Sequence, residues 1–88
     1  MNTEIGKLYK VLRSNEYVFS EKGERYNALD GNPIGYLYID DNFMIIDCML
    51  MNQASYKVKI LWQEKNNICK IGWIWMNINN DSEYEELT

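Results

Sequence analysis

A chain of 88 residues makes one domain with a modest hydrophobic core and leaves no room for a second domain. Hydrophobic residues make up 47% of the chain and aromatic residues 14%, so a packed core is expected. The absence of histidine excludes a catalytic triad or dyad that depends on an imidazole. The net charge of −4 is unevenly distributed, because four of the 13 acidic residues lie in positions 81–88 and residues 1–80 are therefore neutral.

This charge distribution predicts a folded domain over residues 1–80 and a disordered acidic tail over residues 81–88. The N-terminus has neither the basic nor the apolar segment of a secretory signal, and the longest apolar stretch, 43–51, is too short to cross a bilayer. We therefore expect a cytoplasmic protein. The abundance of Asn, Ile, Lys and Tyr is typical of an AT-rich genome, such as that of a low-GC bacterium or its phage.

Short runs of apolar residues predict five to six strands, at 7–13, 17–19, 34–39, 43–51, 56–62 and 68–76. The polar stretch Ser20 to Pro33 is predicted to be a long first loop with short strands of its own. Turns are expected at 40–42, 52–54 and 64–67, and a single helical turn at 77–80. No run has a sustained helical period, so the sequence predicts an all-β barrel or sandwich, and at this length a small barrel.

Two of these strands have distinctive patterns. Residues 43–51 are almost continuously apolar, which predicts a central strand with both faces buried. Residues 56–62 alternate, so that Tyr56, Val58, Ile60 and Trp62 share one face while Lys57, Lys59 and Leu61 share the other. The alternation predicts a strand with one buried face.

The segments Ile34-Gly35-Tyr36-Leu37 and Ile71-Gly72-Trp73-Ile74, with Tyr56-Lys57-Val58 between them, resemble a bacterial-type SH3 domain over most of residues 8–78. The resemblance implies an SH3-like barrel in which 72–74 form the closing strand. It also implies a turn of odd length before that strand, which points Val58, Ile60, Gly72 and Ile74 inward and Trp73 toward a ligand groove. A four-residue turn at 64–67 would instead place Lys59 opposite Gly72. The chain lacks the acidic-aromatic signature of signalling SH3 domains, so proline-rich peptides are not its expected ligand.

The sequence does not predict an enzyme. Cys48 and Cys69 lie in apolar runs and are expected to be buried and unpaired, and Asp40-Asp41 is expected to serve a turn. The five glycines are dispersed, so there is no phosphate-binding loop. No metal site and no cofactor are expected.

Aromatic residues are the main candidates for binding. We expect a groove between the long loop and the closing strand, formed by Tyr17, Phe19, Tyr26, Tyr36, Tyr38, Trp73 and Trp75. The alternative is that these rings complete the core. A basic patch is the second candidate site, formed by Lys57, Lys59, Lys65 and Lys70. The alternative is a solvated outer face, and the neutral body and acidic tail argue against direct nucleic-acid binding.

These observations favour a non-enzymatic protein-interaction module, such as a standalone SH3-like adaptor that binds a larger protein partner. One alternative is a phage anti-defence inhibitor that blocks a nucleic-acid-handling enzyme. A second alternative is a module that binds peptidoglycan or a peptide. A homodimer is also compatible with exposed aromatic rings and an open sheet edge.

Overall fold

In the computed structural model, which describes residues 5–24, 28–51, 55–77 and 83–87, the chain forms one antiparallel sheet of seven strands and no helix. The strands are β1 (Leu8–Val11), β2 (Glu16–Glu21), β3 (Asp30–Leu37), β4 (Asn42–Leu50), β5 (Ser55–Gln63), β6 (Cys69–Asn77) and β7 (Tyr84–Glu86). Their order across the sheet is β3-β2-β6-β5-β4-β1-β7. The predicted all-β class is confirmed, with seven strands in place of five to six.

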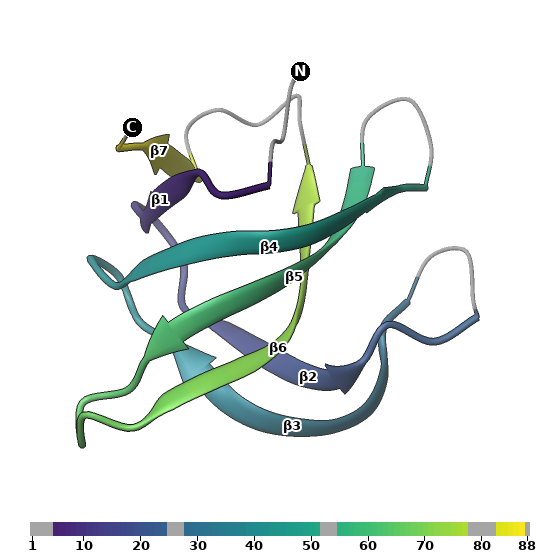
Figure 1. Ribbon diagram of the computed structural model, residues 1–88, viewed down its shortest axis with the longest axis horizontal. Helices are drawn as coiled ribbons and strands as arrows, with labels where there is room; N and C mark the ends of the chain where they lie inside the picture. Colours follow the sequence, from purple (N-terminus) through teal and green to yellow (C-terminus); the bar gives the residue numbers. More distant parts are fainter. Residues whose placement is uncertain (1–4, 25–27, 52–54, 78–82, 88) are drawn as a thin grey trace.

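The strands are arranged as a meander, β4-β5-β6, flanked by the β2–β3 hairpin on one side and by β1 and β7 on the other (Figure 1). The two flanks approach each other at one end of the molecule. There the Val11 amide donates to the Asp41 carbonyl oxygen at 2.9 Å, and the Asp40 amide donates to the Val11 carbonyl oxygen at 2.8 Å. The sheet therefore curves around a single core.

The register of β5 and β6 confirms the odd-length turn. Val58 lies opposite Ile74, and Ile60 lies opposite Gly72, with residues 64–68 between the strands. All four residues are buried, whereas Trp73 is only partly buried. A side chain at position 72 would collide with Val18 of β2, which explains why a glycine stands where β2 crosses β6.

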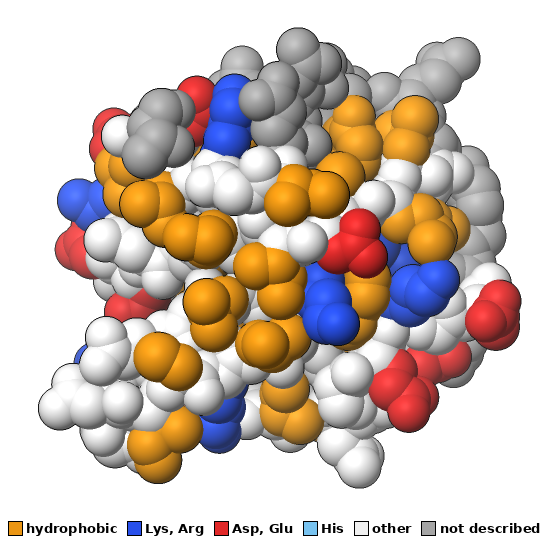
Figure 2. All heavy atoms as spheres, viewed as in Figure 1, with side chains coloured by type: hydrophobic (Ala, Val, Ile, Leu, Met, Phe, Trp, Pro, Cys, Tyr) orange, Lys and Arg blue, Asp and Glu red, His pale blue; other side chains and the backbone are white. Residues whose placement is uncertain are grey.

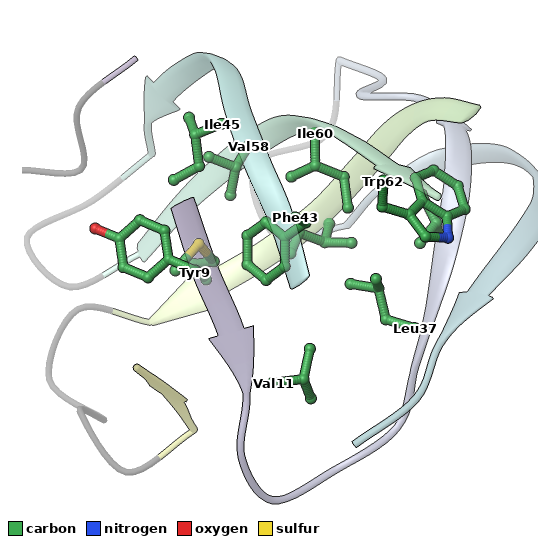
Figure 3. Close-up of a cluster of buried hydrophobic side chains, with 11 residues drawn as sticks. Tyr9, Val11, Leu37, Phe43, Ile45, Val58, Ile60 and Trp62 are labelled. Carbon is green, nitrogen blue, oxygen red and sulfur yellow. The ribbon is translucent and has the colours of Figure 1, made fainter. Parts of the chain in front are cut away.

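The core consists of apolar side chains from β1 to β6, without β7 (Figure 3): Tyr9, Val11, Val18, Leu37, Phe43, Ile45, Val58, Ile60, Trp62, Ile74 and Met76. Each large side chain of this kind contributes roughly 1.5–3 kcal/mol when fully buried. Tyr9 stacks on Phe43 at a ring-centroid distance of 5.8 Å, and the rings of Phe43 and of Tyr84 in β7 are perpendicular to each other at 5.7 Å. Strands distant in sequence therefore converge on Phe43.

β4 differs from the prediction of a strand buried on both faces. Phe43 and Ile45 are buried, but Met49 and Leu50 are exposed. The register with β5 shifts between Ile45 and Asp47, and β1 pairs with only residues 42–44 of β4. The second half of the strand therefore extends beyond the core. Hydrophobic side chains, with charged ones among them, are visible on the face formed by β4, β5 and β6 (Figure 2).

The predicted long loop is shorter than expected, because β2 continues to Glu21 and β3 begins at Asp30. The segment between these strands lies over the end of β5. There the fully buried Lys57 donates from Nζ to the carbonyl oxygen of Lys22 at 2.6 Å. A buried ammonium requires such partners, so Lys57 ties this segment to the sheet.

Residues 84–86 correct the prediction of a disordered tail, because they form strand β7 on β1. Lys7 Nζ lies 3.1 Å from a carboxylate oxygen of Glu86 in the same region. The edge strands are β3 and β7, and β6, with its 72–74 segment, lies between β2 and β5, so it is an interior strand and not the closing one. Of the helical turn expected at 77–80, Asn77 instead ends β6, and residues 78–80 lie outside the described residues, as do tail residues 81, 82 and 88.

Both cysteines are free, as predicted, but only Cys48 is partly buried, and Cys69 is exposed. The burial predicted for Cys69 is wrong because this residue begins β6 directly after the turn, opposite the exposed Gln63. In the part of the chain that the structure describes, no helix has the length and apolar character needed to cross a membrane.

Candidate functional site

The structure divides the predicted aromatic groove into two separate groups of rings. Tyr17, Tyr36 and Tyr38, which we call the tyrosine face, lie on the β2–β3 hairpin and the residues just after it. Phe19, Trp73 and Trp75 lie on β2 and β6. Tyr26 lies outside the described residues.

The tyrosine face is built by local pairing. Tyr17 of β2 lies directly opposite Tyr36 of β3, and alternation along the extended chain puts Tyr38 on the same side as Tyr36. The rings of Tyr17 and Tyr36 meet edge to face at 4.8 Å, and those of Tyr36 and Tyr38 do so at 4.9 Å. Tyr17 remains 60% exposed and Tyr38 41% exposed, whereas Tyr36, which both rings contact, is half-buried.

Two adjoining hollows flank these rings. The first, of about 250 Å³, is lined by Tyr36, Tyr38, Asp41, Glu64, Lys65 and Asn66. The second, of about 410 Å³, is lined by Tyr17, Pro33, Gly35, Tyr36, Tyr38 and Glu64. Both hollows are lined by Tyr36, Tyr38 and Glu64, so they form one surface between the β2–β3 hairpin and the β5–β6 turn.

Charged side chains surround this surface in defined contacts. Lys65 Nζ lies 4.4 Å from the centroid of the Tyr38 ring, in a cation–π arrangement. The Glu64 carboxylate lies 2.8 Å from Lys70 Nζ, which also donates to the Ile34 carbonyl oxygen at 2.8 Å. Asp41 accepts a hydrogen bond from the Tyr38 amide at 2.8 Å. These contacts therefore join the charged side chains around the surface to both the β2–β3 hairpin and the β5–β6 turn.

Gly35 forms part of the floor of the larger hollow. A Cβ atom at this position would collide with the indole ring of Trp62 and approach the Glu64 carboxylate. Trp62 is a core residue with 2% of its surface exposed. The absence of a side chain at Gly35 therefore lets the hairpin lie directly on the core ring.

The second group of rings borders a different hollow. Phe19 lies opposite Trp73 across β2 and β6. A hollow of about 360 Å³ is lined by Phe19, Ala28, Leu29 and Trp75, between the β2–β3 connection and β6. This is where the sequence predicted a groove between loop and closing strand, although with only two of the seven predicted rings.

The four predicted patch lysines do not form one exposed patch. Lys57 is buried beneath the β2–β3 connection, which corrects its assignment to a surface patch. Lys65 and Lys70 contact Tyr38 and Glu64 respectively. Lys59 lies on the outer face of β5, opposite Asp47 and Trp73. Two of the four lysines thus belong to the surroundings of the tyrosine face.

A titratable pair that the sequence did not indicate joins β7 to the start of β2. The Tyr84 hydroxyl donates a hydrogen bond to the Glu16 carboxylate. Burial raises the pKa of Glu16 to about 7; the Tyr84 hydrogen bond opposes this, and nearby Glu83 adds to it. Burial and the Glu16 charge likewise raise the pKa of Tyr84 well above its usual range. The two residues are 68 positions apart, so no local pattern could have linked them.

The described residues contain no group of three or more His, Cys, Asp or Glu side chains positioned to hold a metal ion. No family model, curated protein or solved structure matches the chain.

Proposed function

We propose that this chain is a non-enzymatic binding module with an SH3-like barrel fold, which recognises a segment of a protein partner on the tyrosine face. The observation that carries the proposal is a row of three tyrosines beside two open hollows, in which the exposed Tyr17 and Tyr38 each contact the half-buried Tyr36. Tyrosine is enriched where proteins bind each other, because its large rigid ring contributes apolar contact and its hydroxyl a hydrogen bond.

The strand arrangement supports the proposed fold. A long hairpin precedes a three-stranded meander, and the short strands at the two ends of the chain, β1 and β7, pair with each other beside it. The turn of odd length and the inward-facing Gly72 and Ile74 agree with the register that the SH3 resemblance implies.

The tyrosine face is also suited to binding because none of its three rings belongs to the hydrophobic core. The core is filled by other residues, and Tyr17 and Tyr38 lie outside it. Each of these two rings contacts Tyr36, and contacts that are present before a partner binds lower the ordering cost of binding.

A peptide-display selection on the immobilised full chain tests the proposal. Random linear peptides enriched on the wild type are expected to lose at least about tenfold in affinity for Tyr17→Ala and Tyr36→Ala, which corresponds to about 1.4 kcal/mol. The half-exposed Ile71 on β6 provides a matched control, and Ile71→Ser is expected to bind like the wild type. Thermal unfolding of each variant verifies that it is folded. Equal enrichment on Tyr36→Ala and wild type would contradict the proposal.

A second candidate function is inhibition of a nucleic-acid-handling enzyme through acidic side chains. It is favoured by β7, which fixes the exposed Glu85 and Glu86 on the folded edge of the sheet. In bacteria with a nuclease-based defence system, expression of the chain would then restore plating of a targeted phage. Glu85→Gln should reduce this effect, whereas Glu24→Gln, in the β2–β3 connection, should not.

A further inference from the structure

The hollow beside Tyr38 already contains a cation supplied by the chain itself. Lys65 Nζ lies 4.4 Å from the Tyr38 ring centroid, and Lys65 also lines the hollow. It belongs to the exposed turn between β5 and β6 and forms no ion pair with a carboxylate of the described residues. The ring therefore attracts a positive charge that is not otherwise fixed in place.

The remaining charges of the hollow favour a cation too. When Lys65 is set aside, the lining contains two carboxylates, those of Asp41 and Glu64. Among the described residues, only one ammonium balances these two charges, that of Lys70, which pairs with Glu64. A positive group that replaced Lys65 would meet the negative face of the Tyr38 ring and an excess of negative charge.

We infer that this hollow receives a basic side chain, arginine in preference to lysine, from an extended segment of the protein partner, and that this side chain displaces Lys65. The inference rests on the proposed function and specifies the chemistry of its ligand. Arginine is preferred because its planar guanidinium can stack on a tyrosine ring and at the same time donate to a carboxylate. Lys65 can leave at low cost, because its flexible stem rises from an exposed turn and needs no change in the strands.

The test uses the full chain and short capped peptides with one alanine-proline framework. Their central residue is arginine, its neutral isostere citrulline, or glutamate. The arginine peptide is expected to shift the backbone amide signals of Tyr36, Tyr38 and Asn66 in NMR titrations. It should also abolish the ring-current shift of the Lys65 side-chain protons, because Lys65 leaves the ring. The citrulline and glutamate peptides should bind several-fold more weakly.

Whether Lys65→Gln raises or lowers the binding affinity shows whether the ligand is basic or acidic. Loss of the competing cation should strengthen binding of the arginine peptide roughly two- to fivefold, the range of an exposed cation–π contact. An acidic or nucleic-acid ligand would instead bind this variant more weakly. Lys59→Gln is the matched control, because Lys59 lies on the outer face of β5 and does not line the hollow. It should leave the affinity unchanged.

In the peptide titrations, three results would overturn the inference: equal binding of the arginine and citrulline peptides, weaker binding to Lys65→Gln, or no shift at Tyr38 with any peptide. None of them contradicts the proposed function, because display selection on the tyrosine variants judges that function independently. Enriched peptides without a basic residue would leave the tyrosine face as the binding site and refute its preference for arginine.

Discussion

Two clusters of three aromatic rings lie in different environments in this protein, one at the core and one at the surface. The inner cluster, formed by Tyr9, Phe43 and Tyr84, has centroid distances of 5.8 and 5.7 Å, and two of its members belong to the core. The tyrosine face has centroid distances of 4.8 and 4.9 Å, and its outer two rings, those of Tyr17 and Tyr38, remain 60% and 41% exposed. Ring contact alone therefore does not tell whether an aromatic cluster stabilises a fold or offers a surface.

The origin of the rings accounts for the difference. The inner cluster joins β1, β4 and β7, so forming it requires strands from both ends of the chain. The tyrosine face arises within one hairpin and its immediate continuation. Burial of the inner rings contributes to the free energy of folding, whereas the outer rings retain apolar area that a partner can bury.

The largest effect is expected from the centre of the inner cluster. Phe43→Ala should lower the free energy of unfolding by about 3–5 kcal/mol, because it removes a fully buried ring and leaves a cavity. Phe43→Leu, which retains much of the volume, should lose less than about 1.5 kcal/mol. Urea unfolding measures both. A loss below about 1 kcal/mol for Phe43→Ala would contradict the role assigned to the inner cluster.

The pH dependence of stability tests how the inner cluster is closed by Tyr84 and Glu16. Because folding raises the pKa of Glu16 from 4.5 to about 7, its neutral form is favoured in the folded state. The contribution of the neutral Glu16 carboxyl to the free energy of unfolding is fully present below about pH 4.5 and is lost as the pH rises through about 7. At pH 8, Glu16→Gln should therefore be more stable than the wild type, by up to about 3 kcal/mol.

Thermal unfolding at several pH values between about 4 and 8 measures this difference. The variant and the wild type should converge at the acidic end, where the wild-type carboxyl is also neutral. A variant that is less stable than the wild type at pH 8 would show that the ionised carboxylate, and not the neutral acid, belongs in this position.

An intermediate effect is expected at Gly35, where the tyrosine face rests on the core. Gly35→Ala should cost about 1–3 kcal/mol, because its methyl group collides with the Trp62 ring. A smaller ring at position 62 should relieve part of this cost. The double variant Gly35→Ala/Trp62→Phe should then lose less than the sum of the two single losses in a double-mutant cycle. Simple additivity would mean that the two residues are not in contact.

The smallest effect on stability is expected at the tyrosine face itself. Tyr17→Ala should change the free energy of unfolding by less than about 1 kcal/mol, since its ring is mostly exposed. Chemical unfolding of the same sample used for peptide binding gives the comparison directly. A loss above about 2 kcal/mol would place Tyr17 with the structural rings and remove the contrast between the two clusters.

Local pattern was sufficient for several features of the fold. Alternation between residues 56 and 62 predicted β5 with Val58, Ile60 and Trp62 on its buried face, although Lys57 on the other face is buried as well. Turn chemistry predicted the bend before Asn42, where Asp40 adopts a φ of 76°. These features depend on residues close together in the sequence, so composition and spacing contain the necessary information.

The candidate site was predictable only in its residue types. Exposed aromatics were expected, and six of the seven can now be placed, but their division into two surfaces depends on the pairing of β2 with both β3 and β6. The contact between Lys65 and Tyr38 depends on the β5–β6 turn lying beside the end of β3. No spacing rule joins residues from separate hairpins.

The sequence by itself determined the all-β class, most of the strands and a supply of aromatic rings larger than the core requires. Tertiary structure alone decided which lysine is buried, that residues 84–86 become a strand, and which tyrosines remain in water. The physical reason is that burial is a property of the assembled sheet: an acidic segment such as 84–86 has too few apolar residues to fold alone, and is ordered because β1 offers an edge and Phe43 a ring for Tyr84.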